Sequence, residues 1–136
     1  MKVLVLAAGR SRRMKPVNDK NFLKFLGKSL IEWQLDMLSK AGFEDIILVG
    51  GSHNIDMFRL LSKNFPTKIT VVEQKNLDEG MMGAVLSSTN LFDNKPLLVF
   101  SSNDVVDQDA FDLVMKSAEK SPETDCFMLA KKVREY

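Results

Sequence analysis

The chain has 136 residues, of which 45% are hydrophobic and 27% are charged. That size and composition are typical of one globular domain with a buried core, and they exclude a disordered or fibrous chain. No apolar stretch approaches the roughly 20 residues that a membrane helix needs, and the first residues lack the pattern of a cleaved signal peptide. The single cysteine, Cys126, excludes an internal disulfide and a zinc site built from cysteines. We therefore expect a soluble protein of the cytoplasm.

The charge is distributed unevenly along the chain. Residues 1–28 carry eight basic side chains and one acidic side chain, Asp19, so their local charge is +7, whereas the other 108 residues sum to −6. The net charge of +1 argues against a general nucleic-acid or membrane-surface binder. The basic opening segment instead predicts a local binding site for an anion.

Short apolar runs alternate with segments of helical period along the whole chain. The first run, 3–7, is continuously apolar, which predicts a strand covered on both faces. Residues 29–41 predict a helix, because Ser29 and Glu32 form a capping-box pattern and Gly42 suits the position after the last turn.

The later elements follow the same alternation. Strands are predicted at 46–49, 69–72, 97–101 and 126–130, and helices at about 55–64, at 82–92, and after Asp109 or Asp107 as the N-cap. Strands joined by single helices imply right-handed crossovers and a mainly parallel sheet. We therefore expect a three-layer α/β/α sandwich with the Rossmann-like strand order 3-2-1-4-5, as a single domain over residues 1–136. The thiol of Cys126 would then be buried and inert.

This winding predicts where a ligand binds. In the order 3-2-1-4-5 the chain reverses direction between the first and fourth strands, and ligands bind there, beyond the carboxyl ends of the strands. The loop after the first strand begins at Ala8, and the loop after the fourth contains Asn103 and Asp104. We therefore expect the basic stretch and Asp104 to lie close together.

A glycine-containing loop directly follows the first strand. Gly9 can turn the backbone tightly and offer N–H groups to a phosphate, and the arginines that follow can bind phosphate oxygens. An ordinary turn with solvated arginines is the alternative. The three-glycine dinucleotide fingerprint and the Walker pattern are both absent, which disfavours hydride transfer and P-loop hydrolysis.

Several short motifs keep an order and spacing that resemble those of a known family. They are Leu6-Ala7-Ala8-Gly9-x-Ser11-x-Arg13-Met14-x-Pro16, Lys20-x-Phe22-Leu23 and Gly27-Lys28-x-Leu30-Ile31-Glu32. Together they resemble the opening signature of nucleotidyltransferases of the sugar-1-phosphate and MobA-like types. The resemblance implies that an NMP group is transferred from an NTP to a phosphorylated acceptor, with release of pyrophosphate. It also implies that the chain corresponds to the N-terminal, nucleotide-binding half of a catalytic domain about twice this length.

The resemblance implies roles for individual residues and for a metal. Arg13 and Lys20 would be catalytic, Asp104 would bind Mg²⁺, and the nucleotide would be bound by Ala7, Ala8, Gly9, Ser11, Gln74 and Gly80. The partners would be a nucleoside triphosphate and a phosphorylated small molecule. Arg10 is expected to be surface charge, and His53, the sole histidine, a surface residue.

Departures from the family pattern leave the substrate open. Ser11 stands where sugar-nucleotide enzymes usually have glycine, whereas serine is familiar in the relatives that make molybdenum cofactors. A second metal-binding aspartate normally lies in the other half of the domain. A non-catalytic nucleotide-binding or regulatory module is therefore the main alternative, and a domain that acts only through protein contacts is a third.

Overall fold

The computed structural model describes residues 1–124 and 126–130. The chain forms two compact units, Met1–Asp104 and Val105–Tyr136, and each is described by itself. The single domain over residues 1–136 stays a prediction.

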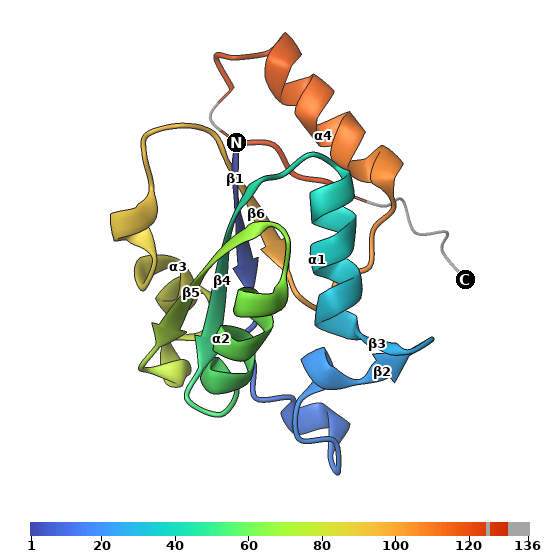
Figure 1. The fold of residues 1–136 in the computed structure, drawn as a ribbon. Helices are drawn as coiled ribbons and strands as arrows, with labels where there is room; N and C mark the ends of the chain where they lie inside the picture. Colours follow the sequence, from blue (N-terminus) through green and yellow to red (C-terminus); the bar gives the residue numbers. More distant parts are fainter. Residues whose placement is uncertain (125, 131–136) are drawn as a thin grey trace, which may run out of the picture. The chain divides into compact units, whose positions relative to one another are not determined.

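The first unit is built on a parallel sheet of four strands (Figure 1). They are β1 (Lys2–Leu6), β4 (Asp45–Gly51), β5 (Lys68–Gln74) and β6 (Leu97–Ser101), in the order β5-β4-β1-β6. Because β1 is central, Val3 is paired with Ile46 of β4 on one side and with Leu98 of β6 on the other. In order of sequence this is 3-2-1-4, so the predicted winding is confirmed for its first four strands.

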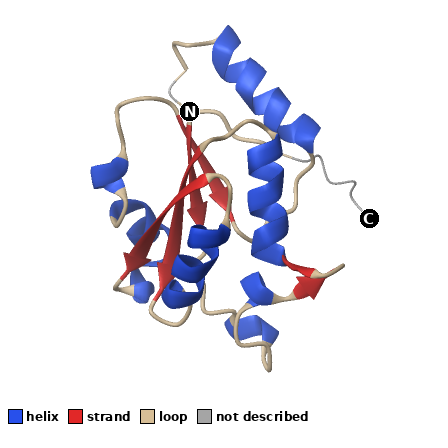
Figure 2. Ribbon diagram, in the orientation of Figure 1, coloured by secondary structure: helices blue, strands red, loops and turns tan. Residues whose placement is uncertain are grey.

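Helices cover both faces of this sheet (Figures 1 and 2). They are α1 (Leu30–Lys40), α2 (Ile55–Asn64) and α3 (Gly80–Leu86). Right-handed crossovers from β1 to β4 and from β4 to β5 place α1 and α2 on one face, and the return from β5 to β6 places α3 on the other. On the α3 side Leu4, Ile47 and Val49 form a buried cluster with Ala84. Both faces of β1 are therefore buried, as its continuous apolar run predicts.

Helix α1 has the ends that the sequence predicts. Ser29 Oγ accepts from the Glu32 amide, and a Glu32 carboxylate oxygen accepts from the Ser29 amide at 2.7 Å, which completes the capping box. The Ser29 hydroxyl also donates to this carboxylate at 2.5 Å. The hydrogen bonds that Glu32 accepts from the Ser29 hydroxyl and from the Ser29 amide lower the pKa of Glu32. After the helix, Gly42 has a φ of 86°, a left-handed conformation that suits glycine.

The predicted helix over 82–92 is shorter in the structure. Helix α3 begins at Gly80 and ends at Leu86, and a 3₁₀ turn, η4 (Thr89–Leu91), follows. The Ser87 and Ser88 hydroxyls donate to the carbonyls of Gly83 and Val85. Such side-chain bonds compete with a regular helix and are common where one ends.

Small elements between β1 and α1 complete this part of the chain. Two 3₁₀ turns, η1 (Arg12–Met14) and η2 (Lys20–Phe22), are followed by a short antiparallel hairpin of β2 (Lys24–Phe25) and β3 (Lys28–Ser29). A further 3₁₀ turn, η3 (Leu77–Glu79), lies between β5 and α3. Among the described residues, no helix is long and apolar enough to cross a membrane.

The second unit contains helix α4 (Gln108–Lys120). Its N-cap is Asp107, whose carboxylate accepts from the Ala110 amide at 3.0 Å, rather than Asp109. The predicted fifth strand is wrong, because residues 126–130 pair with no other strand. The prediction of a buried Cys126 is wrong for the same reason, since this thiol is exposed. An apolar run forms a stable strand only where a neighbouring strand can pair with it.

Candidate functional site

Two adjoining cavities lie beyond the carboxyl ends of the strands of the first unit. The narrow cavity has a volume of about 210 Å³ and the wide cavity about 730 Å³. Gly9, Arg10, Lys20, Leu77 and Asn103 line both. The two cavities are therefore parts of one site at the sheet edge where the winding predicts a ligand.

The loop after β1 forms part of the lining. Ala8 lines the narrow cavity and Gly9 lines both, whereas Ala7 is buried and its amide donates to Val49 O at 2.9 Å. A Cβ added to Gly9 would meet no atom within 4 Å. The space beside the Gly9 backbone is therefore open to a ligand.

Ser11 closes the turn of this loop. Its φ is 50°, a left-handed conformation in which glycine is favoured over other residues. Glycine would therefore adopt this conformation with less strain than serine does. The serine hydroxyl adds a contact that glycine lacks, because Ser11 Oγ accepts from the Lys20 amide at 3.0 Å. Ser11 itself lines the wide cavity.

Lys20 joins the loops after β1 and β6. Its Nζ donates to Asn103 Oδ1 at 2.8 Å, and the Ser101 hydroxyl donates to the same oxygen at 2.9 Å. The prediction that these two loops lie together is confirmed by this contact. Asn103 was expected only as the neighbour of Asp104, and nothing in the local sequence signals its bond to Lys20.

Asp104 lies beside the cavities but is not among the residues that line them. Its side chain is exposed, and one carboxylate oxygen accepts from Asn103 Nδ2 at 3.3 Å. The Asp104 carbonyl accepts from the buried Gln34 at 3.1 Å, which holds the loop in place. Among the described residues, no three His, Cys, Asp or Glu side chains form a group that could hold a metal. A cation here would therefore depend on oxygen atoms from a ligand as well.

The arginines occupy the wide cavity. Arg13 is exposed and lines it, as the predicted role requires. Arg10, expected as surface charge, lines both cavities, and its guanidinium pairs with Asp78 of η3 at 3.0 Å. The sequence did not reveal this pair, because Asp78 comes from a distant loop that approaches only when β5 packs beside β4.

Gln74 and Gly80 line the narrow cavity. Gln74 is buried, and its Nε2 donates to the carbonyls of Asn76 and Gly80 at 2.8 and 2.9 Å. Gly80 has a φ of 61° and a ψ of −145°, which is essentially open to glycine alone. Helix α3 approaches Gln74 so closely that a Cβ on Gly83 would lie 2.5 Å from Nε2. The amide group of Gln74 therefore organises the loop that lines this cavity.

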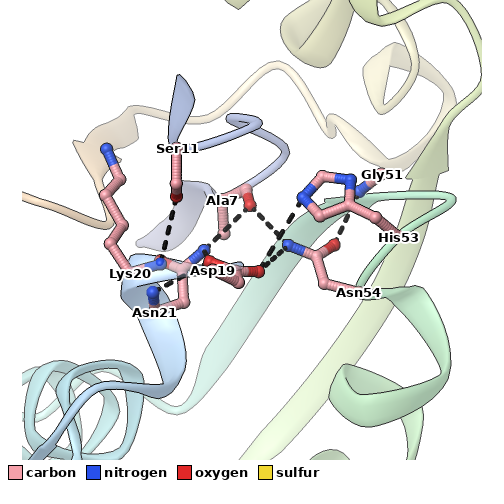
Figure 3. A network of polar contacts seen from close by, with 8 residues as sticks. All are labelled: Ala7, Ser11, Asp19, Lys20, Asn21, Gly51, His53 and Asn54. Atoms are coloured by element: carbon pink, nitrogen blue, oxygen red, sulfur yellow. Dashed lines mark hydrogen bonds and ion pairs between the residues drawn. The ribbon is translucent and has the colours of Figure 1, made fainter. Parts of the chain in front are cut away.

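A buried polar network lies behind the loop after β1 (Figure 3). The side-chain amides of Asn21 and Asn54 both donate to the Ala7 carbonyl, at 3.1 and 3.0 Å, and both donate to Asp19, at 2.8 and 2.6 Å. His53 Nε2 lies 3.8 Å from the same carboxylate. Sequence reasoning missed this network, although Asp19 stood out as the only acidic residue in a strongly basic segment.

The site as a whole suits a polyphosphate. It combines open backbone at Gly9 with guanidinium and ammonium groups at Arg13 and Lys20, and such groups bind phosphate oxygens through charge-assisted hydrogen bonds. The sole histidine, His53, is exposed and contacts Asp19. The geometry thus favours binding and charge stabilisation of an anionic ligand.

Curated relatives are similar to this chain over most of its length. A bifunctional sugar-1-phosphate nucleotidylyltransferase/acetyltransferase of Sulfurisphaera tokodaii is 34% identical over 103 residues, which cover 74% of this chain and 24% of that protein. An N-acetylmuramate alpha-1-phosphate uridylyltransferase of Neisseria meningitidis is 29% identical over 128 residues, which cover 90% of this chain and 55% of that protein. The chain therefore spans about a quarter of one relative and about half of the other.

Solved structures share the fold. The inositol-1-phosphate CTP transferase from T. maritima superposes with a TM-score of 0.73 at 21% identity, over 82% of this chain and 46% of that one. A UDP-glucose pyrophosphorylase complexed with UDP-glucose has a TM-score of 0.73 at 20% identity, over 89% of this chain and 54% of that one. These likenesses show the Rossmann-like fold.

The family is shown by a match over nearly the whole chain. The model of the MobA-like NTP transferase domain matches residues 3–135. The chain belongs to the family of MobA-like NTP transferase domains.

Proposed function

We propose that the chain supplies the nucleotide-binding part of a Mg²⁺-dependent nucleotidyltransferase. It would transfer NMP from an NTP to a phosphorylated acceptor, such as a sugar 1-phosphate, and release pyrophosphate. The observation that carries this proposal is the convergence of Gly9, Arg13 and Lys20 on one wide cavity. The acceptor class is supported by the two curated relatives, a sugar-1-phosphate nucleotidylyltransferase/acetyltransferase and an N-acetylmuramate alpha-1-phosphate uridylyltransferase.

The reaction needs charge stabilisation more than a general base. An oxygen of the acceptor phosphate attacks the α-phosphorus, a new P–O bond forms, and the bond to the pyrophosphate oxygen breaks. A phosphate monoester has a second pKa of about 6, so its attacking oxygen is already an anion at pH 7. The Gly9 and Ser11 N–H groups would bind phosphate oxygens, while Arg13 and Lys20 would stabilise the charge that develops on them.

The residues present fit Mg²⁺ as a partner of the triphosphate. Asp104 offers an exposed carboxylate, and Mg²⁺ typically takes one or two carboxylates together with substrate phosphates and waters. When bound, the ion would neutralise phosphate charge. Among the described residues, Asp104 would be the one acidic ligand. The resemblance implies that a second acidic ligand would come from the other half of the domain.

Composition also bears on the location and the remaining partners. A single cysteine is compatible with a reducing compartment, and we propose the cytoplasm. The partners would be small phosphorylated molecules rather than nucleic acid, because the excess positive charge is confined to residues 1–28.

Titration calorimetry with ATP, CTP, GTP and UTP, each with and without Mg²⁺, tests the proposal. We expect one base to be preferred and Mg²⁺ to strengthen binding. Arg13→Ala should weaken that binding by about tenfold or more, which corresponds to about 1.4 kcal/mol. Lys63→Ala is the control, since Lys63 is an exposed lysine in the last turn of α2. In a protein that holds both halves, Arg13→Ala should lower turnover by about 100-fold or more.

The alternatives predict other results. A non-catalytic nucleotide-binding or regulatory module would bind a triphosphate selectively but give no turnover when an acceptor half is present. A domain that acts only through protein contacts would bind none of the four triphosphates. Either result would contradict the proposed transferase.

A further inference from the structure

We propose that Asp19 is the positioning residue for Lys20, and that it acts by fixing the backbone from which the lysine side chain reaches into the cavities. The inference rests on the proposed function in one respect, namely that Lys20 meets the triphosphate. Asp19 does not line either cavity. Any effect of Asp19 on a ligand would therefore be indirect, and the proposal assigns it to Lys20.

The two oxygens of Asp19 have different partners. Oδ1 accepts from the Asn21 amide at 2.9 Å and from Asn21 Nδ2 at 2.8 Å, which caps the turn η2. Oδ2 accepts from Asn54 Nδ2 at 2.6 Å and lies 3.8 Å from His53 Nε2. Capping needs only the first oxygen. The second oxygen binds η2 to the turn between β4 and α2 instead.

This cross-link is anchored to the end of the central strand. Asn54 also donates to the Ala7 carbonyl, and its Oδ1 accepts from the Gly51 amide at 2.8 Å. Asn21 donates to the same carbonyl from the other side. Asp19 is thus linked through Asn21 and Asn54 to the residue that follows the central strand, and Figure 3 shows these side chains converging behind the loop.

As a result, hydrogen bonds hold the backbone of Lys20 at its own amide and at both neighbouring residues. Its neighbours on either side, Asp19 and Asn21, are both bonded within the network, and its own amide donates to Ser11 Oγ. The side chain extends from this backbone to Asn103. Because a lysine side chain is long and flexible, a fixed backbone position limits the volume that its ammonium group can reach.

The environment of Asp19 explains why a carboxylate is needed. Its side chain is only 10% exposed, and a nearly buried charge is costly unless hydrogen bonds satisfy it. Three N–H donors and His53 surround it. A neutral residue could satisfy some of these donors but not all of them.

Asp19→Asn is the first test, because it keeps the size of the side chain and an oxygen for the cap. The new amide would direct an NH₂ group at one of the donors. A flip of the Asn54 amide could accept it, but only by removing one of the two side-chain donors to Ala7 O and the acceptor of the Gly51 amide. Asp19→Ser is the second variant, since serine can cap η2 but has no second oxygen for Asn54.

The readout is the rate at which an acetylating reagent modifies Lys20 relative to the exposed Lys15, measured by peptide mass spectrometry on the full chain without nucleotide. We expect both Asp19 variants to raise this ratio several-fold, because the ammonium group leaves Asn103 more often. They should also weaken binding of inorganic tripolyphosphate by about tenfold, since a small misplacement of a binding group is costly. Asp45→Ser is the control, because this carboxylate of β4 is paired with Lys68. Asp45 is 25 residues from Lys20 in the sequence and, among the described residues, shares no partner with it.

A purely structural role for Asp19 predicts lower stability with the Lys20 ratio and the tripolyphosphate affinity both unchanged, and that result would overturn the proposal. The wild-type chain separates the two proposals. If tripolyphosphate does not protect wild-type Lys20 from acetylation, the proposed function fails, whereas a raised ratio in the Asp19 variants still supports the positioning role.

Discussion

The Lys20 ammonium group donates a hydrogen bond of 2.8 Å to Oδ1 of Asn103, which lies 83 residues further along the chain. The acceptor is neutral and the pair is exposed, so the contact holds the lysine only weakly. A phosphate oxygen is a stronger acceptor because it carries charge. Lys20 therefore lines both cavities in a position from which its ammonium group can exchange Asn103 for a phosphate oxygen.

Gly9→Ala tests whether a ligand approaches the backbone of the loop after β1. No atom of the chain lies within 4 Å of the added Cβ, and Gly9 does not have a positive φ. The free energy of unfolding should therefore change by no more than about 0.5 kcal/mol. Triphosphate affinity should nevertheless fall, because the methyl group would occupy the space that the phosphates need. Urea unfolding and calorimetry on the same sample measure both, and unchanged affinity would show that no ligand group packs there.

Ser11→Gly and Ser11→Ala separate the backbone and the hydroxyl of Ser11. Both remove the bond to the Lys20 amide, but only glycine relieves the left-handed φ of 50°. The alanine variant should therefore be less stable than the glycine variant by about 1 kcal/mol. Urea unfolding of the two variants checks this order, and equal stabilities would mean that this conformation is not strained.

Gly83→Ala should disturb the narrow cavity by displacing Gln74, which lines it. The added Cβ would lie 2.5 Å from Gln74 Nε2 and 2.5 Å from Glu79 Cβ, so α3 or the loop before it must shift. We expect a loss of roughly 1–3 kcal/mol in the free energy of unfolding, as for other overpacked sites. Loss of base preference should accompany it. A variant with native stability would show that Gln74 can move aside without effect.

The capping box of α1 should make stability depend on pH in acid. The pKa of Glu32 is lowered below its ordinary value of 4.5 by hydrogen bonds from Ser29. A lowered folded-state pKa means that the ionised form stabilises the fold above pH 4.5, and that this contribution is lost as the pH falls through the folded-state value. The difference in unfolding free energy between the wild type and Glu32→Gln should therefore be largest near pH 7 and should shrink below pH 4.5. Ser29→Ala, which removes the cap itself, should cost about 1 kcal/mol at pH 7.

The elements could be predicted where the signals are local. Helix α2 and strand β6 have the predicted bounds, because apolar runs, caps and the proline after Phe65 act over a few residues. The predicted strand at 126–130 failed because pairing is not a local property. The same limit applies to the predicted helix over 82–92, which hydroxyl groups end early.

The site residues also differ in whether their contacts can be predicted from local sequence. Motif spacing singles out Gly9 and Lys20, and the strand winding predicts the edge of the sheet at which they lie. Both residues line the two cavities at that edge. The bond from Asn54 to Asp19 joins residues 35 apart in sequence, and neither residue has a neighbour that signals the contact. Such contacts arise when separate crossovers end at the same edge of the sheet, which a single sequence does not display.

The ion pair between Arg10 and Asp78 changes how Arg10 meets an anion. The guanidinium is already balanced by the carboxylate of Asp78 in η3, so an arriving phosphate does not meet Arg10 as an unpaired cation. Exposed ion pairs contribute only about 0–1 kcal/mol, so exchange of Asp78 for a phosphate oxygen would cost little. Freed from Arg10, Asp78 would then be an unpaired negative charge beside a polyanion, and the two like charges would repel each other.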